Sequence, residues 1–184
     1  MLRLRFEHPK HLGILFDIAI KSTMSVDQFL RHHQFEFPRF THEAAYTCAQ
    51  FDALDLNLSG VRNKNLFLQD KKGRRHFLVL TPPDHQVDLT ALSSKLGVKK
   101  LGLASQDRLG RYLGVESGSV SILALVNDSE LKVELVVDRT IWHADAIQAH
   151  PLINTETVII ESQGLQRFLS LTGHKPTVIE VPRL

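Results

Sequence analysis

The sequence predicts an α/β (α+β) fold, a single domain built on a mixed β-sheet flanked by short helices. Three observations lead to this prediction. Apolar runs of strand length alternate with short helical patterns, and two neighbouring pairs of runs are joined by turn residues as in β-hairpins. A chain of 184 residues with 43% hydrophobic residues can bury one sizeable core but hardly two. The formal net charge of +2 permits an acidic or nucleic-acid partner without requiring one.

The beginning of the chain differs from the rest. Residues 1–23 mix charges with one apolar patch that is too short to span a bilayer. A helix is expected to begin after Ser25, because Gln28 completes a capping box and an apolar stripe follows at helical spacing. We therefore expect residues 1–23 to be an N-terminal extension and residues 24–184 to be the domain.

The pattern between this helix and the next strand pair is less regular. Phe35 to Phe37 alternates like a short strand, which Pro38 would end or place at a sheet edge. Thr41 is expected to cap a second helix through residues 43–45. Residues 52–60 carry alternating apolar side chains but no clear boundaries.

A β-hairpin is expected around Gly73. Residues 66–68 form an apolar strand, turn residues follow, and the chain returns from Arg75 to Leu80. Lys64 stands out because it places a cation at the mouth of this strand, between two amide side chains. It can be a solvated charge that protects a sheet edge from pairing, or a functional group. Periodicity alone favours the solvated charge.

The second half of the chain alternates helices and strands. Asp88 and Ser105 are expected to cap two helices, which Gly97 and Gly114 end. Gly118 to Asn127 is expected to turn into a strand buried on both faces, because it is almost continuously apolar. The other expected elements are strands over 99–103, 132–137, 155–161 and 177–181, and a helix from Ser162 to Gly173.

Several familiar site motifs are absent from the sequence. There is no phosphate-binding Gly-x-x-x-x-Gly-Lys-Ser/Thr loop and no Gly-x-Gly-x-x-Gly turn. None of the ten histidines lies in a metal-binding spacing, so we expect no protein-bound metal. The single cysteine, Cys48, cannot form an internal disulfide, and no signal-peptide or membrane-spanning pattern occurs. A cytoplasmic location without membrane contact is expected.

Three features could carry chemistry. They are Lys64, the loop from Gly118 to Ile122 with its backbone N–H groups and serines, and His150, which the rigid Pro151 follows. Each also has an ordinary explanation, respectively a surface charge, a turn glycine and a loop or core histidine.

Short motifs that contain these features recur in a recognisable order. They are Lys64-Asn65-Leu66-Phe67-Leu68, Asp70-Lys71-Lys72-Gly73, Leu103-Ala104-Ser105, Leu113-Gly114-Val115, Gly118-Ser119-Val120-Ser121, Leu125-Val126-Asn127-Asp128 and His150-Pro151-Leu152-Ile153-Asn154-Thr155. Together they closely resemble the YbaK/ProX (PrdX) family of trans-editing aminoacyl-tRNA deacylases, related to the editing domain of prolyl-tRNA synthetase. The resemblance extends from about Ser25 to Val181.

The resemblance implies hydrolysis of the ester in a mischarged aminoacyl-tRNA, without metal or cofactor, in a YbaK-like domain with a partly barrel-like sheet. Lys64 matches the family lysine and would be the catalytic residue, holding a terminal phosphate or polarising the ester carbonyl. No side chain suggests itself as a general base, and the family's usual explanation is that the 2′-hydroxyl of the substrate assists the attacking water. The substrate-binding residues that the resemblance implies are Asn65, Gly118, Ser119, Val120, Ser121 and His150.

One departure from the family concerns the identity of the substrate. Ile122 occupies the position of the family's loop proline, and its less restricted backbone could change the loop and the size limit of the pocket. Alanyl-tRNA(Pro) is the first choice, and seryl-, threonyl- and cysteinyl-tRNA stay open because one methylene changes binding by only ~1–3 kcal/mol.

The remaining expectations concern partners. The tRNA acceptor end would contact basic residues at and near the hairpin turn, although a solvated turn explains them equally well. These residues are Lys71, Lys72, Arg74 and Arg75, with Lys99 and Lys100. Prolyl-tRNA synthetase is a further expected partner. The alternatives are a tRNA-binding or synthetase-associated module of the same fold without activity, and an unrelated small-molecule-binding α/β domain.

Overall fold

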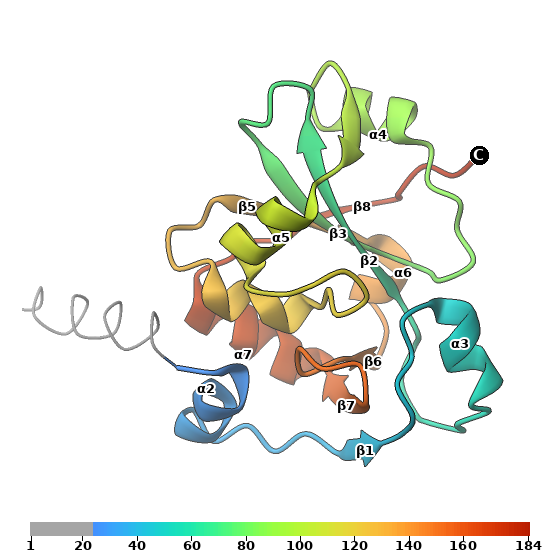
Figure 1. Ribbon diagram of the computed structural model, residues 1–184, viewed down its shortest axis with the longest axis vertical. Coiled ribbons are helices and arrows are strands. Elements are labelled where there is room, and N and C mark those ends of the chain that lie inside the picture. Colours follow the sequence, from blue (N-terminus) through green and yellow to red (C-terminus); the bar gives the residue numbers. More distant parts are fainter. Residues whose placement is uncertain (1–23) are drawn as a thin grey trace, which may run out of the picture.

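Two β-sheets that meet at a corner organise the fold (Figure 1). The computed structural model describes residues 24–184, so the expected extension over residues 1–23 lies outside the described residues. The larger sheet is mixed, because β2 is antiparallel to its two neighbours whereas β3, β5 and β8 run parallel. Its strand order is β4 (Leu101–Leu103), β2 (Lys64–Asp70), β3 (His76–Thr81), β5 (Val133–Asp138) and β8 (Thr177–Ile179).

The smaller sheet is antiparallel. Its strand order is β1 (Arg39–Thr41), β7 (Glu156–Glu161) and β6 (Ala146–Ala149). The two sheets are joined just before β2, where Val61 pairs with Ile147: the Val61 amide donates to the Ala146 carbonyl at 2.8 Å, and the Gln148 amide donates to the Val61 carbonyl at 3.0 Å. This corner makes the arrangement partly barrel-like and places the start of β2 beside the end of β6.

Helices cover both faces of the larger sheet. Alternate strand residues point to opposite faces, so Phe67 and Leu78 enter a large core while Leu68 and Phe77 enter a smaller one. The large core is completed by α2 (Val26–His32), α5 (Gln106–Leu113), the 3₁₀ helix η1 (Ile122–Asn127) and α7 (Ser162–Thr172). The smaller core is completed by α4 (Leu89–Lys95). The remaining helices are α3 (Cys48–Ala53) and α6 (Arg139–Trp142).

The predicted fold class is confirmed, and so are most of the predicted elements. The capping box of Ser25 and Gln28 forms with both of its hydrogen bonds. The hairpin around Gly73 forms β2 and β3, and the predicted helices after Asp88 and Ser105 form α4 and α5. No helix among residues 24–184 combines the length and the apolar character that crossing a bilayer requires.

Three element predictions are wrong. Residues 122–127 form η1 and not a strand, because Ser121 caps the run through the Leu123 amide at 3.3 Å and five consecutive apolar residues carry no period that separates helix from strand. Strand pairing begins after Pro38, which lacks an N–H, and not at Phe35. Thr41 ends β1 and caps no helix; the second helix begins later, after Thr47. The elements that the sequence analysis missed are β6 and α6.

Candidate active site

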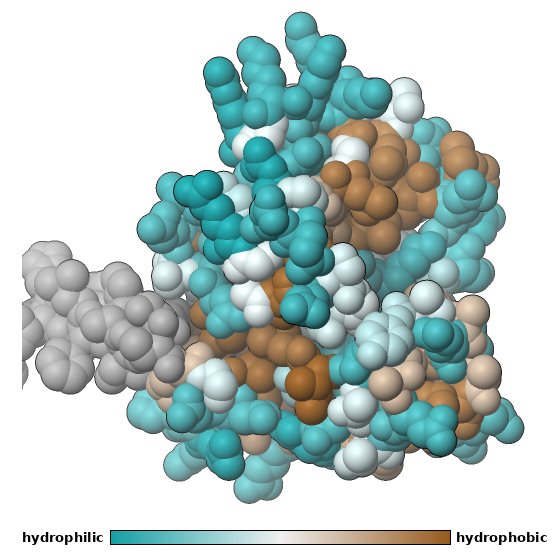
Figure 2. Space-filling view, in the orientation of Figure 1, coloured by the Kyte–Doolittle hydropathy of each residue, from teal (hydrophilic) through white to brown (hydrophobic). Residues whose placement is uncertain are grey.

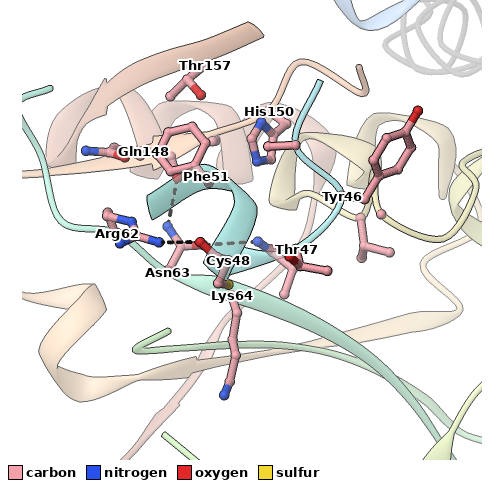
Figure 3. Close-up of a pocket in the computed structure, with 15 residues that line it drawn as sticks. Tyr46, Thr47, Cys48, Phe51, Arg62, Asn63, Lys64, Gln148, His150 and Thr157 are labelled. Atoms are coloured by element: carbon pink, nitrogen blue, oxygen red, sulfur yellow. Dashed lines mark hydrogen bonds between the residues drawn. The ribbon is translucent and has the colours of Figure 1, made fainter. Parts of the chain in front are cut away.

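A pocket opens at the corner between the two sheets, under α3 (Figure 3). Four segments meet there: the turn before α3 and α3 itself, the start of β2, the loop at Gly118, and the end of β6 with β7. The lining residues are Ala45, Tyr46, Thr47, Cys48, Phe51, Arg62, Asn63, Lys64, Asn65, Gly118, Val120, Gln148, Ala149, His150 and Thr157. Four of the residues predicted for the site line this pocket besides Lys64: Asn65, Gly118, Val120 and His150.

Amide side chains fasten β2 to β6 on one side of the pocket. Asn63 Nδ2 donates to the Gln148 carbonyl at 2.7 Å, and Asn65 Nδ2 donates to Asn63 Oδ1 at 3.0 Å. Gln148 Nε2 lies within 3.1–3.3 Å of three carbonyl oxygens, those of residues 58, 59 and 60. Asn65 Oδ1 and Gln148 Oε1 are buried without a hydrogen-bond partner among residues 24–184. The junction therefore holds two hydrogen-bond acceptors that this part of the chain leaves unsatisfied.

His150 presents a neutral ring to the pocket. Its Nδ1 lies 3.0 Å from the carbonyl oxygen of Glu156, which can only accept, so Nδ1 carries the proton and Nε2 has the lone pair. Burial lowers the pKa of His150 from its usual 6.5, since the charged ring is poorly solvated there, and the nearby His42 lowers it further. At neutral pH Nε2 is thus a hydrogen-bond acceptor.

A second histidine, which the sequence analysis missed, supports this wall. His42 Nδ1 donates to the Glu43 carbonyl at 2.7 Å, and its Nε2 accepts from Thr157 Oγ1 at 3.0 Å. The His42 ring lies edge-on to Phe51, with centroids 5.2 Å apart, and Phe51 lies edge-on to His150 at 5.9 Å. No local sequence pattern indicates this cluster, because its members come from segments more than 90 residues apart.

The Lys64 ammonium points away from the pocket (Figure 3). Lys64 Nζ donates to the carbonyl of Pro83 at 3.1 Å and to the carbonyl of His85. Alternation along β2 explains this direction, because Lys64 shares a face with Leu66 and Leu68, which pack in the smaller core. The backbone of Lys64 borders the pocket, whereas its charge holds the loop after β3.

The loop at Gly118 approaches the pocket from the opposite side. Gly118 has φ +89°, and a Cβ there would lie 3.2 Å from Cδ1 of Tyr46, so glycine permits this close packing. Of the four predicted loop residues, Ser119 and Ser121 do not line the pocket: the Ser119 amide donates to the Glu116 carbonyl, and the buried Ser121 caps η1. Ile122 is also buried in the large core, away from the pocket lining.

Basic residues gather at the other end of β2. Figure 2 shows hydrophilic side chains projecting from the top of the molecule, over the β2–β3 hairpin. Lys71, Lys72 and Arg74 are exposed there, and the Lys71 amide donates to the Lys100 carbonyl at 3.0 Å, which brings Lys99 and Lys100 alongside. We name these five residues the basic tip. The charge of each residue is evident from the sequence, but their grouping in space depends on the pairing of β2 with β4.

Arg75 is not part of the basic tip. Its Nε and Nη2 each lie 2.7 Å from a carboxylate oxygen of Glu134, and its Nη1 donates to the Leu96 carbonyl at 3.1 Å. This bidentate ion pair neutralises Arg75 within the protein, so the structure separates it from the other predicted RNA contacts.

The turn that carries the basic tip is held from below by α5. Arg108 Nη1 donates to the Gly73 carbonyl at 3.1 Å and to Nε2 of the buried His76 at 2.7 Å. Burial and the adjacent Arg108 charge both lower the pKa of His76, so its ring is neutral and can accept this bond. Gly73 has φ +63°, and a Cβ there would clash with the Arg108 guanidinium.

The site thus defines a mixed α/β domain that has a small polar pocket with a neutral histidine at one end of β2 and an exposed cationic surface at the other. The comparisons with known proteins specify the family. The family model described as "Aminoacyl-tRNA editing domain" matches residues 42–168. The chain belongs to this family of aminoacyl-tRNA deacylases, and the resemblance to YbaK/ProX proteins is confirmed.

Individual relatives agree with this placement. The chain is 35% identical over 140 residues to "Prolyl-tRNA editing protein ProX" of Acetoanaerobium sticklandii, covering 76% of this chain and 85% of that protein. It is 38% identical over 156 residues to "Prolyl-tRNA synthetase associated domain-containing protein 1" of Danio rerio, covering 84% of each. The crystal structure of a candidate trans-editing enzyme for prolyl tRNA synthetase shares the fold, with TM-score 0.61 at 15% identity, covering 97% of this chain and 100% of that one.

Proposed function

We propose that this chain acts in trans, in the cytoplasm, to hydrolyse alanine from mischarged alanyl-tRNA(Pro). The observation that carries the proposal is the pocket at the sheet corner, which a neutral His150 and the Gly118 loop both line. The names of the ProX and synthetase-associated relatives support tRNA(Pro) as the substrate and prolyl-tRNA synthetase as a partner. Residues 24–184 are the proposed deacylase domain, and residues 1–23 the proposed extension.

The proposed reaction adds water to the ester carbonyl carbon and breaks the bond to the ribose oxygen. It releases the free amino acid and a tRNA with an unmodified 3′ end. The described pocket offers no carboxylate beside His150 to orient it as a general base, so the 2′-hydroxyl of the substrate assists the attacking water. His150 Nε2 accepts a hydrogen bond from the α-ammonium group of the aminoacyl ester, which fixes the carbonyl in place.

Lys64 remains the proposed catalytic cation, and its ammonium would exchange its present hydrogen-bond partners for the substrate. In the free chain its ammonium donates to the Pro83 and His85 carbonyls. For this role the Lys64 side chain must leave both carbonyls and turn from the smaller-core face of β2 to the pocket, where its ammonium would bind a phosphate or a developing oxyanion. Asn65, beside it on the strand, offers its unsatisfied Oδ1 to the terminal nucleotide.

A small side chain fits the apolar part of the proposed acyl pocket. Phe51, Val120 and Ala149 are among the apolar residues of the lining, and the Phe51 ring lies 5.9 Å from the His150 ring. Ile122 leaves this wall unchanged, because its side chain packs in the large core. Since such walls separate substrates by only ~1–3 kcal/mol per methylene, seryl, threonyl and cysteinyl esters are the alternative substrates.

The basic tip is the proposed contact for tRNA phosphates. It lies about 20 Å from Lys64, because six residues of β2 separate the two at ~3.3 Å each. A polyanionic stem that leaves the pocket along β2 would meet five cations at this distance.

The test is deacylation of tRNA(Pro) carrying alanine, serine, threonine, cysteine or proline, by the wild type and by Lys64→Ala. Selective loss of alanine, abolished in the variant, is the expected result. If every ester survived at enzyme excess while tRNA still bound, the chain would be a tRNA-binding module of the same fold and not a deacylase.

A further inference from the structure

Arg62 is a charged residue of the pocket lining that the proposed reaction does not use. It directly precedes Asn63 and Lys64 and sends its guanidinium toward α3 (Figure 3). Three contacts join them: an ion pair from Nη1 to Asp52 Oδ1, a bond from Nη2 to the Cys48 carbonyl at 3.4 Å, and the guanidinium over the Phe51 ring, 5.4 Å from its centroid. One side chain therefore touches the beginning, the middle and the end of the helix.

The helix α3 has little else to hold it. It is six residues long, and none of them is buried. Its capping box between Thr47 and Gln50 is internal to the segment and fixes its conformation but not its position. Apart from Arg62, Phe51 supplies the ring contacts to His42 and His150. A surface helix with few apolar contacts shifts easily unless polar contacts fasten it.

Arg62 can fasten α3 because its own backbone is held on both sides. Val61 makes two backbone bonds to β6, and Asn63 donates to the Gln148 carbonyl at 2.7 Å. The guanidinium thus holds α3, and with it the Phe51 ring, in a fixed position relative to the sheet corner.

We propose that Arg62 is a positioning residue for amino-acid selection. By fastening α3 to the sheet corner, it keeps the Phe51 ring against His150, and this ring limits the length of side chain that the acyl pocket accepts. The inference rests on the proposed deacylase function and specifies how that function discriminates between esters. When Arg62 is removed, α3 can move outward and a longer side chain enters.

The expected effect is moderate, because the ion pair is partly exposed and the contact with the ring is long. Arg62→Ala should lower the preference for the alanyl over the 2-aminobutyryl ester, which has one more methylene, by about three- to tenfold. Arg62→Lys keeps the charge but not the planar fork, so it should restore part of the preference. Asp52→Asn, on the exposed side of the pair, should change the preference in the same direction by less.

The experiment measures kcat/KM for both esters on tRNA(Pro), with hydrogen exchange of the amides of residues 47–54 in the free protein. Arg139→Ala, an exposed arginine on α6, is the matched control. A fall in the ratio with faster exchange in Arg62→Ala, and neither in the control, supports the proposal. An unchanged ratio, or an equal loss for both esters, overturns it while the wild type is active. A wild type inert toward both esters overturns the deacylase function itself.

Discussion

The two ends of β2 differ in how their charges are used. At the Lys64 end, the cations have partners within the protein: Lys64 holds two carbonyls, and Arg62 pairs with Asp52. At the other end the basic tip is exposed, whereas the neighbouring Arg75 is paired with Glu134. One strand thus connects a pocket suited to selection and chemistry with a surface suited to sequence-independent binding. The difference predicts that the two functions can be lost separately.

The largest expected effect is at the pocket end. His150→Ala should lower kcat/KM for alanyl-tRNA(Pro) about 10- to 100-fold, because one hydrogen bond to a charged group is lost. Affinity for uncharged tRNA should stay unchanged. Single-turnover deacylation and filter binding measure the two quantities. A parallel loss of affinity would mean that the pocket also supplies the RNA contacts.

The pH dependence of kcat/KM should reflect the protonation of His150. Because burial lowers the pKa of His150 from 6.5, the ring gains its proton at a lower pH than an exposed histidine does. Activity should therefore fall about tenfold per pH unit below this lowered pKa and not above it. His150→Ala should lack this fall. A midpoint above 6.5 would contradict the neutral-acceptor role.

At the hairpin end, the expected effect is on binding. The triple change Lys71→Gln, Lys72→Gln and Arg74→Gln should weaken tRNA affinity about tenfold at low salt and reduce the salt slope by about 2–3, with kcat unchanged. Binding isotherms at several salt concentrations measure both. An unaltered salt slope would mean that the basic tip does not contact the RNA phosphates.

Arg75→Gln should have the smallest effect on RNA. Its guanidinium is paired with Glu134, so tRNA affinity should change less than about twofold. Thermal unfolding should report a loss of up to about 1 kcal/mol in folding free energy, the upper range for a partly exposed ion pair. A tenfold loss of tRNA affinity would mean that Arg75 contacts the RNA together with the basic tip.

The comparison of the two ends also shows what sequence reasoning can reach. The cap at Ser25 with Gln28 and the turn at Gly73 were predictable because each acts within four residues of itself, whereas Thr41 caps no helix and Ser105 makes no side-chain cap bond. The direction of Lys64 was predictable from its alternation with Leu66 and Leu68, although the resemblance to the family drew attention to its charge instead. The strand predicted over 122–127 failed because a short apolar run suits either structure.

Long-range contacts within the site were not predictable from the sequence. The bond between His42 and Thr157 joins residues 115 positions apart, and no motif marks either one. Arg62 directly precedes Asn63 and Lys64, but no sequence motif assigned it a role. Its partners are 10 to 14 residues earlier, in a segment whose helix was misplaced.

The separation of the two ends is tested most directly by comparing two substrates with the same ester. Alanine is attached to full tRNA(Pro) and to a short 3′-terminal oligonucleotide that cannot reach the basic tip. The wild type should prefer the full tRNA, and the triple basic-tip variant should lose this preference while hydrolysing the short substrate at the wild-type rate. Equal losses on both substrates would contradict the separation, since the hairpin would then act on the pocket itself.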